Sequence, residues 1–200
     1  MARKSSRAMW AEKILKSGAS GGGSVRVSPS KLPDVAARAP FFGTVIGIDP
    51  SLRGTGLAVV RMSRGGRPEL LGSRIVKNPP RLTQAECLGE IFRAVDRLAC
   101  RFEADCAAVE QTIYVQNNQT ALILGSARGA AIAAAANFEI PVFEYPPLRI
   151  KQAVVGFGRA SKEQVSRTVA SILGIEPLGF DESDAAAAAL AHIFTHKEYI

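Results

Sequence analysis

Paired cysteines and long apolar runs are both missing from this chain. Its three cysteines, Cys87, Cys100 and Cys106, include no CxxC pair and have no neighbouring histidine. This argues against a disulfide framework and against a zinc site, and it favours a reducing compartment. No stretch approaches the roughly 20 uncharged residues that a membrane-spanning helix needs. We therefore predict a soluble, cytoplasmic protein that has no membrane partner.

The chain also has fewer acidic than basic residues. The 200 residues include 25 Lys or Arg against 18 Asp or Glu, which gives a net charge of +7 and a pI of about 9.7. This balance favours an anionic partner such as nucleic acid. Hydrophobic residues make up 47% and charged residues 22% of the chain, as in a globular protein, and the length suits one domain.

Most of the net positive charge lies in residues 1–43, which hold eight Lys or Arg and only two acidic residues. This stretch is also rich in Ser and Gly, and such a composition cannot bury enough apolar surface to offset its ordering entropy. We predict a flexible basic N-terminal extension over residues 1–43 and one folded domain over residues 44–200. The extension could instead be an organelle transit peptide, because it is basic, rich in serine and poor in acidic residues.

The hydrophobic pattern of residues 44–200 predicts an α/β fold. Short apolar, β-branched runs favour strands at 44–48, 57–62, 70–76, 106–109 and 141–143. Amphipathic or alanine-rich segments favour helices at 82–102, 121–138, 151–155, 162–173 and 181–196. The order βββαβαβ followed by helices indicates a mixed five-stranded sheet flanked by α-helices.

Four carboxylates stand at the ends of these predicted elements. Asp49 follows the first strand, Glu110 follows the fourth, and Asp181 and Asp184 share one face at the start of the last helix. Each has an ordinary alternative: a turn-forming Asp before Pro50, a charge at a strand end, and acidic residues that interact favourably with a helix dipole. If the first and fourth strands are neighbours and the last helix packs across their ends, the four carboxylates meet in one pocket.

Such a cluster favours bound cations, because like charges raise one another's pKa. An all-oxygen site suits Mg²⁺, with Mn²⁺ as a substitute, and either one or two ions are compatible with the pattern. Two ions about 3.5–4 Å apart can clamp the attacking water and the leaving oxygen of a phosphodiester. The pattern therefore predicts metal-dependent hydrolysis of a nucleic-acid backbone without a side-chain nucleophile.

Short motifs between residues 44 and 196 resemble those of the RuvC Holliday junction resolvases, in order and with similar spacing. They are Gly47-Ile48-Asp49-Pro50 with Arg53 and Thr55-Gly56, Val109-Glu110-Gln111, Asn117 with Leu124-Gly125-Ser126-Ala127-Arg128-Gly129, Val142-Phe143-Glu144-Tyr145, Lys151-Gln152-Ala153-Val154-Val155-Gly156, and Asp181 with Asp184-Ala185.

The resemblance implies an RNase H-like fold and a homodimer that nicks four-way junction DNA symmetrically under Mg²⁺ during recombination and repair. It also suggests a branch-migration motor as a partner and a nucleoid-associated enzyme. Asp49, Glu110, Asp181 and Asp184 match the family's four catalytic positions, although some members have a histidine where Asp181 stands. Two other readings stay open: a junction-binding module without nuclease activity, and a nuclease directed at RNA or at RNA/DNA hybrids.

Several candidate DNA contacts follow from the same resemblance. Lys151 and Lys162 match basic positions near the scissile backbone, but either could be an ordinary surface lysine. Arg128 is a further candidate. The family often has an aromatic residue three positions after the catalytic glutamate; this chain has Ile113 there and Tyr114 next. Tyr114 could stack on bases in its place or simply be a packed side chain.

The helix predicted at 121–138 has small side chains over much of its surface. A two-fold pairing of this helix with its copy would form the dimer interface. The alternative is that the helix packs closely on its own sheet.

Overall fold

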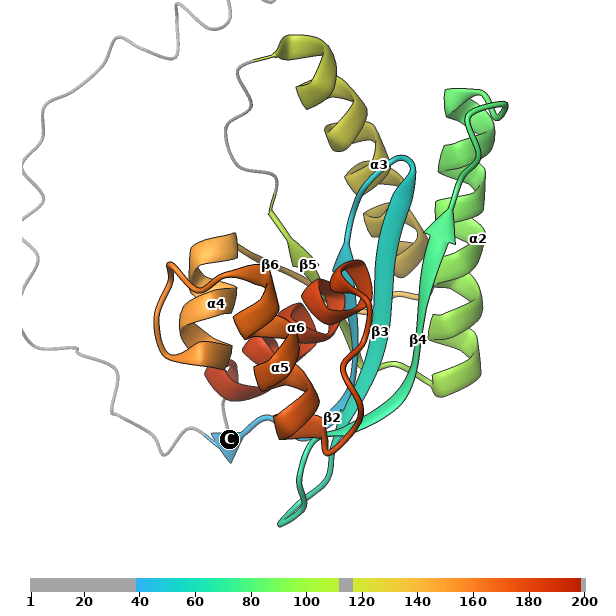
Figure 1. Cartoon of the computed structure of the whole chain (residues 1–200). Coiled ribbons are helices and arrows are strands. Elements are labelled where there is room, and N and C mark those ends of the chain that lie inside the picture. The colour runs from blue at the N-terminus through green and yellow to red at the C-terminus, as the bar shows by residue number, and fades with distance from the viewer. Residues whose placement is uncertain (1–38, 112–116, 199–200) are drawn as a thin grey trace, which may run out of the picture. The chain divides into compact units, whose positions relative to one another are not determined.

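The computed structural model describes residues 39–111 and 117–198, which form a sheet covered by helices on both faces (Figure 1). The sheet order is β4-β3-β2-β5-β6; the β4-β3 and β3-β2 pairs are antiparallel, and the β2-β5 and β5-β6 pairs are parallel. The strands are β2 (Gly43–Asp49), β3 (Gly54–Met62), β4 (Glu69–Lys77), β5 (Cys106–Glu110) and β6 (Val142–Tyr145). The predicted mixed five-stranded sheet is confirmed.

Alternation along the strands divides the core into two layers. Ile46, Ile48 and Val109 point to one face, where α2 (Gln84–Phe102) and α3 (Asn118–Asn137) cover them. Val45 and Ala108 point to the other face, which is covered by three helices. These are α4 (Pro147–Val155), α5 (Lys162–Leu173) and α6 (Phe180–Thr195).

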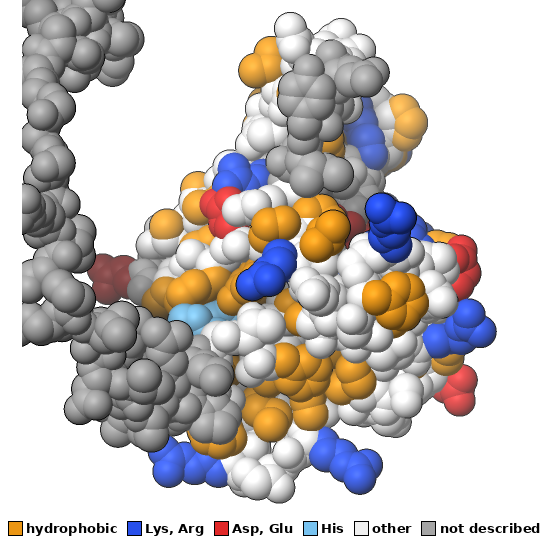
Figure 2. All heavy atoms as spheres, turned by 90° about the vertical axis from the view of Figure 1, so that its left-hand side faces the viewer, with side chains coloured by type: hydrophobic (Ala, Val, Ile, Leu, Met, Phe, Trp, Pro, Cys, Tyr) orange, Lys and Arg blue, Asp and Glu red, His pale blue; other side chains and the backbone are white. Residues whose placement is uncertain are grey.

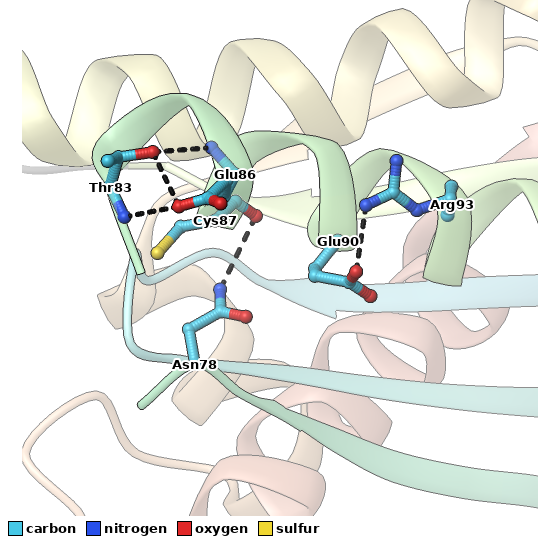
Figure 3. Close-up of polar contacts among 6 residues, drawn as sticks. All are labelled: Asn78, Thr83, Glu86, Cys87, Glu90 and Arg93. Carbon is cyan, nitrogen blue, oxygen red and sulfur yellow. Dashed lines mark hydrogen bonds and ion pairs between the residues drawn. The ribbon is translucent and has the colours of Figure 1, made fainter. Parts of the chain in front are cut away.

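The loop that follows β2 is fastened to the start of α2. The Asn78 side-chain amide is buried and donates to the carbonyls of Leu52, at 2.8 Å, and Cys87, at 3.3 Å. Arg53 donates from the same loop to the carbonyls of Pro79 and Leu82. Figure 3 shows Asn78 below the first turn of α2.

A capping box begins α2. The Thr83 hydroxyl accepts a hydrogen bond from the Glu86 amide, and the Glu86 carboxylate accepts one from the Thr83 amide at 2.8 Å (Figure 3). The chain that leaves β2 is therefore held against a well-defined helix end.

The predicted extension, residues 1–43, lies mostly outside the described residues. Of its last residues, Ala39–Pro40 form β1, which pairs antiparallel with β7 (Lys197–Glu198). The Phe41 ring is buried and meets the His192 ring edge-on, with 4.7 Å between centroids. Among the helices described, none is long and apolar enough to cross a membrane.

Candidate active site

Asp49 and Glu110 come to the same edge of the sheet because β2 and β5 run in parallel. The register pairs Ile48 with Val109, so that the next residue of each strand is the carboxylate. The condition on which the carboxylate pocket depended, that the first and fourth strands are neighbours, is met. Both residues are only partly exposed, since helices cover the sheet on either side.

Two glycines let α6 lie directly on the sheet at this edge. A methyl group at Gly47 in β2 would be 1.9 Å from the Ala185 carbonyl oxygen, and one at Gly56 in β3 would be 1.9 Å from the Asp181 carbonyl oxygen. Neither position can hold a side chain without moving the helix. On the helix side the contact is made by residues 185–189, five alanines that are completely buried. This close approach carries Asp181 and Asp184 to the ends of β2 and β3.

The far end of α6 is held by a polar cluster. His192 is buried, with its Nδ1 2.8 Å from the Tyr145 hydroxyl of β6 and its Nε2 3.4 Å from the Cys106 sulfur of β5. Burial, followed by the neighbouring His196, lowers the His192 pKa to about 4, so the ring is neutral at physiological pH. The helix is therefore fixed to β5 and β6 as well as to β2 and β3.

Asp49, Glu110 and Asp184 line one pocket with a volume of about 380 Å³, together with Lys151 and Lys162. Asp181 lies beside it, with its Oδ2 3.4 Å from where a Cβ on Gly54 would be. The structure thus brings the four predicted catalytic carboxylates and both predicted lysines to one region.

Burial and the charges of neighbouring carboxylates disfavour ionisation of Asp49 and Glu110. Burial, followed by the charge of Asp184, raises the pKa of Asp49 to about 6. Burial, followed by the charges of Asp49 and Asp184, raises the pKa of Glu110 to about 7. Lys162 acts in the opposite direction on both groups.

The two lysines make different contacts. Lys162 donates from its ammonium group to Asp184 Oδ2 at 2.8 Å, and this hydrogen bond raises the Lys162 pKa. Lys151 donates to the Ala160 carbonyl at 2.8 Å. Lys162 therefore balances negative charge in the pocket. Lys151 also lowers the pKa of Glu110, and in addition it holds the segment that precedes α5.

The donor chemistry of the pocket fits a hard divalent cation, because its charged oxygens are partly buried and lack enough positive partners. As the side chains stand, however, no group of three or more His, Cys, Asp or Glu within residues 39–111 and 117–198 converges tightly enough to hold an ion. The Lys162 ammonium already bonds Asp184. Coordination by three or more of these carboxylates therefore requires side-chain rotation.

The other two candidate DNA contacts are placed differently. Arg128 projects from α3, forms an ion pair with Glu144 of β6, and is not among the residues that line the pocket. Tyr114 belongs to residues 112–116, which lie outside the described part of the chain.

Comparison of the sequence with known families gives a match over most of the chain. The profile described as "Crossover junction endodeoxyribonuclease RuvC" matches residues 45–192. The chain belongs to the RuvC family. The RuvC of Alkaliphilus oremlandii is 37% identical over 153 residues, which cover 76% of this chain and 93% of that protein.

Solved RuvC structures agree with this assignment. Thermus thermophilus RuvC has a TM-score of 0.69 and 37% identity, and the same protein in complex with a Holliday junction substrate has a TM-score of 0.71 and 36% identity. Each match covers 76% of this chain and 93% of the RuvC chain. The predicted RNase H-like α/β fold is confirmed.

Proposed function

We propose that this RuvC family member is a structure-selective endodeoxyribonuclease that resolves Holliday junctions by symmetric phosphodiester hydrolysis in recombination and repair. The observation that carries the proposal is the pocket in which Asp49, Glu110 and Asp184 meet, with Asp181 beside it. The T. thermophilus relative, solved with a Holliday junction substrate, supports the choice of substrate.

Nucleases of this family depend on a metal ion, and we propose Mg²⁺ here, with Mn²⁺ as a substitute, in one or two sites per pocket. Asp49, Glu110, Asp181 and Asp184 would be the ligands. When bound, such cations lower the pKa of the attacking water and neutralise charge that develops on the phosphate. The raised pKa values of Asp49 and Glu110 support the proposal, because burial and neighbouring carboxylates disfavour their charged forms and a bound cation would offset both effects.

The lysines complete the proposed chemistry. Lys162, once released from Asp184, presents a positive charge to the scissile phosphate from the wall of the pocket. Lys151 lines the same wall and fixes the segment between α4 and α5 through the Ala160 carbonyl. Tyr114 and Arg128 stay proposed DNA contacts.

A homodimer is the proposed assembly, because a four-way junction offers two equivalent strands to cut. The structural feature that supports a dimer is the exposed outer face of α3. Leu122 is 72% exposed there, and a methyl group at Gly125 or Gly129 would meet nothing within 4 Å. A monomeric mass by light scattering at micromolar concentration would contradict this assembly.

The remaining proposals concern the setting of the enzyme. We propose that the basic residues 1–38 form an extension that adds affinity for DNA. The predicted boundary at residue 43 is too late, because Ala39–Pro40 pair with β7, Phe41 is buried and β2 begins at Gly43. The RuvC relatives are bacterial, which supports a cytoplasmic enzyme. Nucleoid association and a branch-migration motor as partner remain part of the proposal. An organelle is the alternative if residues 1–43 act as a transit peptide.

The decisive experiment compares a labelled four-way junction, a plain duplex and an RNA/DNA hybrid, each with Mg²⁺ or with EDTA. We expect paired symmetric nicks in the junction alone, dependent on Mg²⁺. Asp49→Asn should bind the junction at least as well as wild type and cut it about a thousandfold more slowly or worse. Tight junction binding without nicking by the wild type would identify a binding module, and preferred cutting of the hybrid would identify an RNA-directed nuclease.

A further inference from the structure

The segment that joins α4 to α5, residues 156–161, lies in the chain between two residues that line the pocket. Lys151 of α4 and Lys162, the first residue of α5, both line the pocket. Lys151 also donates to the Ala160 carbonyl inside the segment, at 2.8 Å. The position of the segment is therefore coupled to that of two pocket-lining residues.

Phe157 is exposed in this segment. Its side chain is 48% accessible, and it stands between Gly156, whose φ of +93° ends α4, and Gly158. A methyl group at Gly158 would come within 2.6 Å of Leu148 Cγ, so the backbone after Phe157 lies against the first turn of α4. That turn begins at Pro147, which lines the pocket. The backbone after Phe157 therefore packs on the residue next to one that lines the pocket.

The charged residues near Phe157 in the sequence are mostly basic. Arg149, Lys151, Arg159 and Lys162 surround it in sequence, and Glu163 lies in the first turn of α5. Figure 2 views the side on which α4 lies in Figure 1, and there hydrophobic side chains are exposed with lysine and arginine side chains among them. An exposed aromatic ring among cations is typical of surfaces that bind unpaired nucleic-acid bases, because rings stack on bases while cations meet the phosphates.

We propose that the Phe157 ring stacks on a base of the junction next to the phosphate held in the pocket. The proposal rests on the proposed nuclease function. In continuous duplex each base face is already covered by its neighbours, whereas at a branch point the stack is interrupted. A ring at the mouth of the pocket therefore favours cutting at the branch over cutting in a duplex arm. Stacking tolerates any base, so Phe157 contributes to selectivity for structure and not for sequence.

The test measures binding in EDTA and single-turnover nicking in Mg²⁺, with the full-length protein on junction and duplex. Phe157→Leu keeps an apolar side chain of similar reach but removes the aromatic face, and Phe157→Trp keeps that face. We expect Phe157→Leu to lose about 5- to 150-fold in junction affinity, from the usual effect of removing one stacked aromatic, with duplex affinity unchanged. Phe157→Trp should bind the junction within about threefold of wild type, because it keeps an aromatic face that can stack on a base.

Phe194→Leu is the matched control. Phe194 is 42% exposed, but it lies ten residues beyond Asp184 in α6, about 15 Å along the helix axis. It should bind and nick like the wild type. A direct readout is photo-crosslinking to a junction that carries 5-iodouracil beside the scissile phosphate, where wild type should crosslink at Phe157 and Phe157→Leu should not.

Three results would overturn the proposal: unchanged junction binding and nicking by Phe157→Leu, equal losses in Phe157→Leu and Phe157→Trp, or equal losses of Phe157→Leu on junction and duplex. If junction binding and nicking by Phe157→Leu are unchanged, the exposed surface of Phe157 and Leu148 would instead be a contact for a protein partner. Failure of the proposed function is separate, because it would appear in the wild type as an absence of junction nicking.

Discussion

Gly47 of β2 lies directly beneath Ala185 of α6, so closely that a methyl group on Gly47 would come within 1.9 Å of the Ala185 carbonyl oxygen. The contact is between backbones, next in sequence to Asp184 and two residues from Asp49. The relative position of these two carboxylates therefore depends on the absence of a side chain at residue 47.

Gly47→Ala should consequently damage both stability and activity. We expect the free energy of unfolding to fall by about 3 kcal/mol, at the upper end of overpacking effects. Because α6 must move, the nicking rate of protein that remains folded should fall at least about tenfold. Gly89→Ala in α2 is the control, since its new methyl would meet only the flexible end of Arg93 and alanine favours helix. Denaturant unfolding and single-turnover nicking would measure both effects, and a Gly47→Ala protein with wild-type nicking would contradict the prediction.

Without a bound metal, ionised Asp49 and Glu110 should lower the free energy of unfolding. The pKa of Asp49 is raised to about 6 and that of Glu110 to about 7, so between about pH 4 and pH 7 the folded state binds more protons than the unfolded chain. Stability from these groups therefore falls as pH rises through that window. In EDTA at pH 8, Asp49→Asn should be more stable than wild type by about 2 kcal/mol, allowing for partial solvent screening.

Thermal unfolding across pH would check this. The advantage of Asp49→Asn should shrink toward pH 4, and Mg²⁺ should stabilise the wild type more than the variant. Glu69→Gln, an exposed change at the start of β4, should stay within about 0.5 kcal/mol of wild type at every pH. An Asp49→Asn protein less stable than wild type in EDTA at pH 8 would be inconsistent with the burial described for Asp49.

Lys162 should compete with divalent cations for Asp184. Lys162→Gln removes an ammonium group that lies 2.8 Å from Asp184 and that lowers the pKa of Asp49 and of Glu110. We expect Mn²⁺ to bind the DNA-free variant more tightly than wild type, by about threefold to tenfold, while nicking slows by about a hundredfold. Calorimetric Mn²⁺ titration would separate the two effects. Lys162→Arg keeps the charge and should have near wild-type Mn²⁺ affinity; weaker Mn²⁺ binding by Lys162→Gln would contradict the competition.

The Asn78 amide should be needed for the geometry of the loop after Asp49. Asn78→Ala leaves the carbonyls of Leu52 and Cys87 without this donor in a buried place, which should cost about 1–3 kcal/mol (Figure 3). Because Leu52 is three residues from Asp49, nicking should also slow in protein that remains folded. Glu90→Gln, which weakens the exposed pair with Arg93 in the same helix, is the control and should change stability by less than about 0.5 kcal/mol. Unfolding curves that match for wild type and Asn78→Ala would refute this role.

Deleting residues 1–38 tests whether the basic extension binds DNA. Every phosphate that the extension neutralises should add about 0.9 to the slope of log affinity against log salt, so the deletion should make that slope shallower. We also expect weaker junction binding at low salt, with the nicking rate at saturation unchanged. Fluorescence anisotropy at several salt concentrations would measure this, and an identical slope would remove the extension from the binding surface.

The layout of the fold could be predicted from local patterns, because strand runs and helix periodicity are local properties. The adjacency of β2 and β5, on which the meeting of Asp49 and Glu110 depends, could only be stated as a condition from the sequence, and it is observed in the structure. Glycines inside buried strands signal close backbone approach. Gly47 and Gly56 are such glycines. Together with the alanine-rich last helix, they could have predicted that α6 packs directly on β2 and β3.

Other contacts were beyond sequence reasoning because their partners are far apart in the chain. Nothing local to Arg128 shows that Glu144 will pair with it, and nothing local to Lys162 points to Asp184. Likewise His192 is buried only because Tyr145 and Cys106 from two other strands offer it polar partners. Side-chain pairing of this kind needs the three-dimensional positions of the backbone.

The five buried alanines of α6 also affect how firmly the pocket is held. Alanine has no side-chain torsion to freeze, so ordering this stretch costs almost none of the rotamer entropy that leucine or methionine would lose. The layer beneath the carboxylates consequently has few alternative side-chain arrangements to visit. Thermal fluctuation there is limited to movement of whole backbone segments, and the slowest amide hydrogen exchange in the protein should be found in α6 and in the strands directly under it.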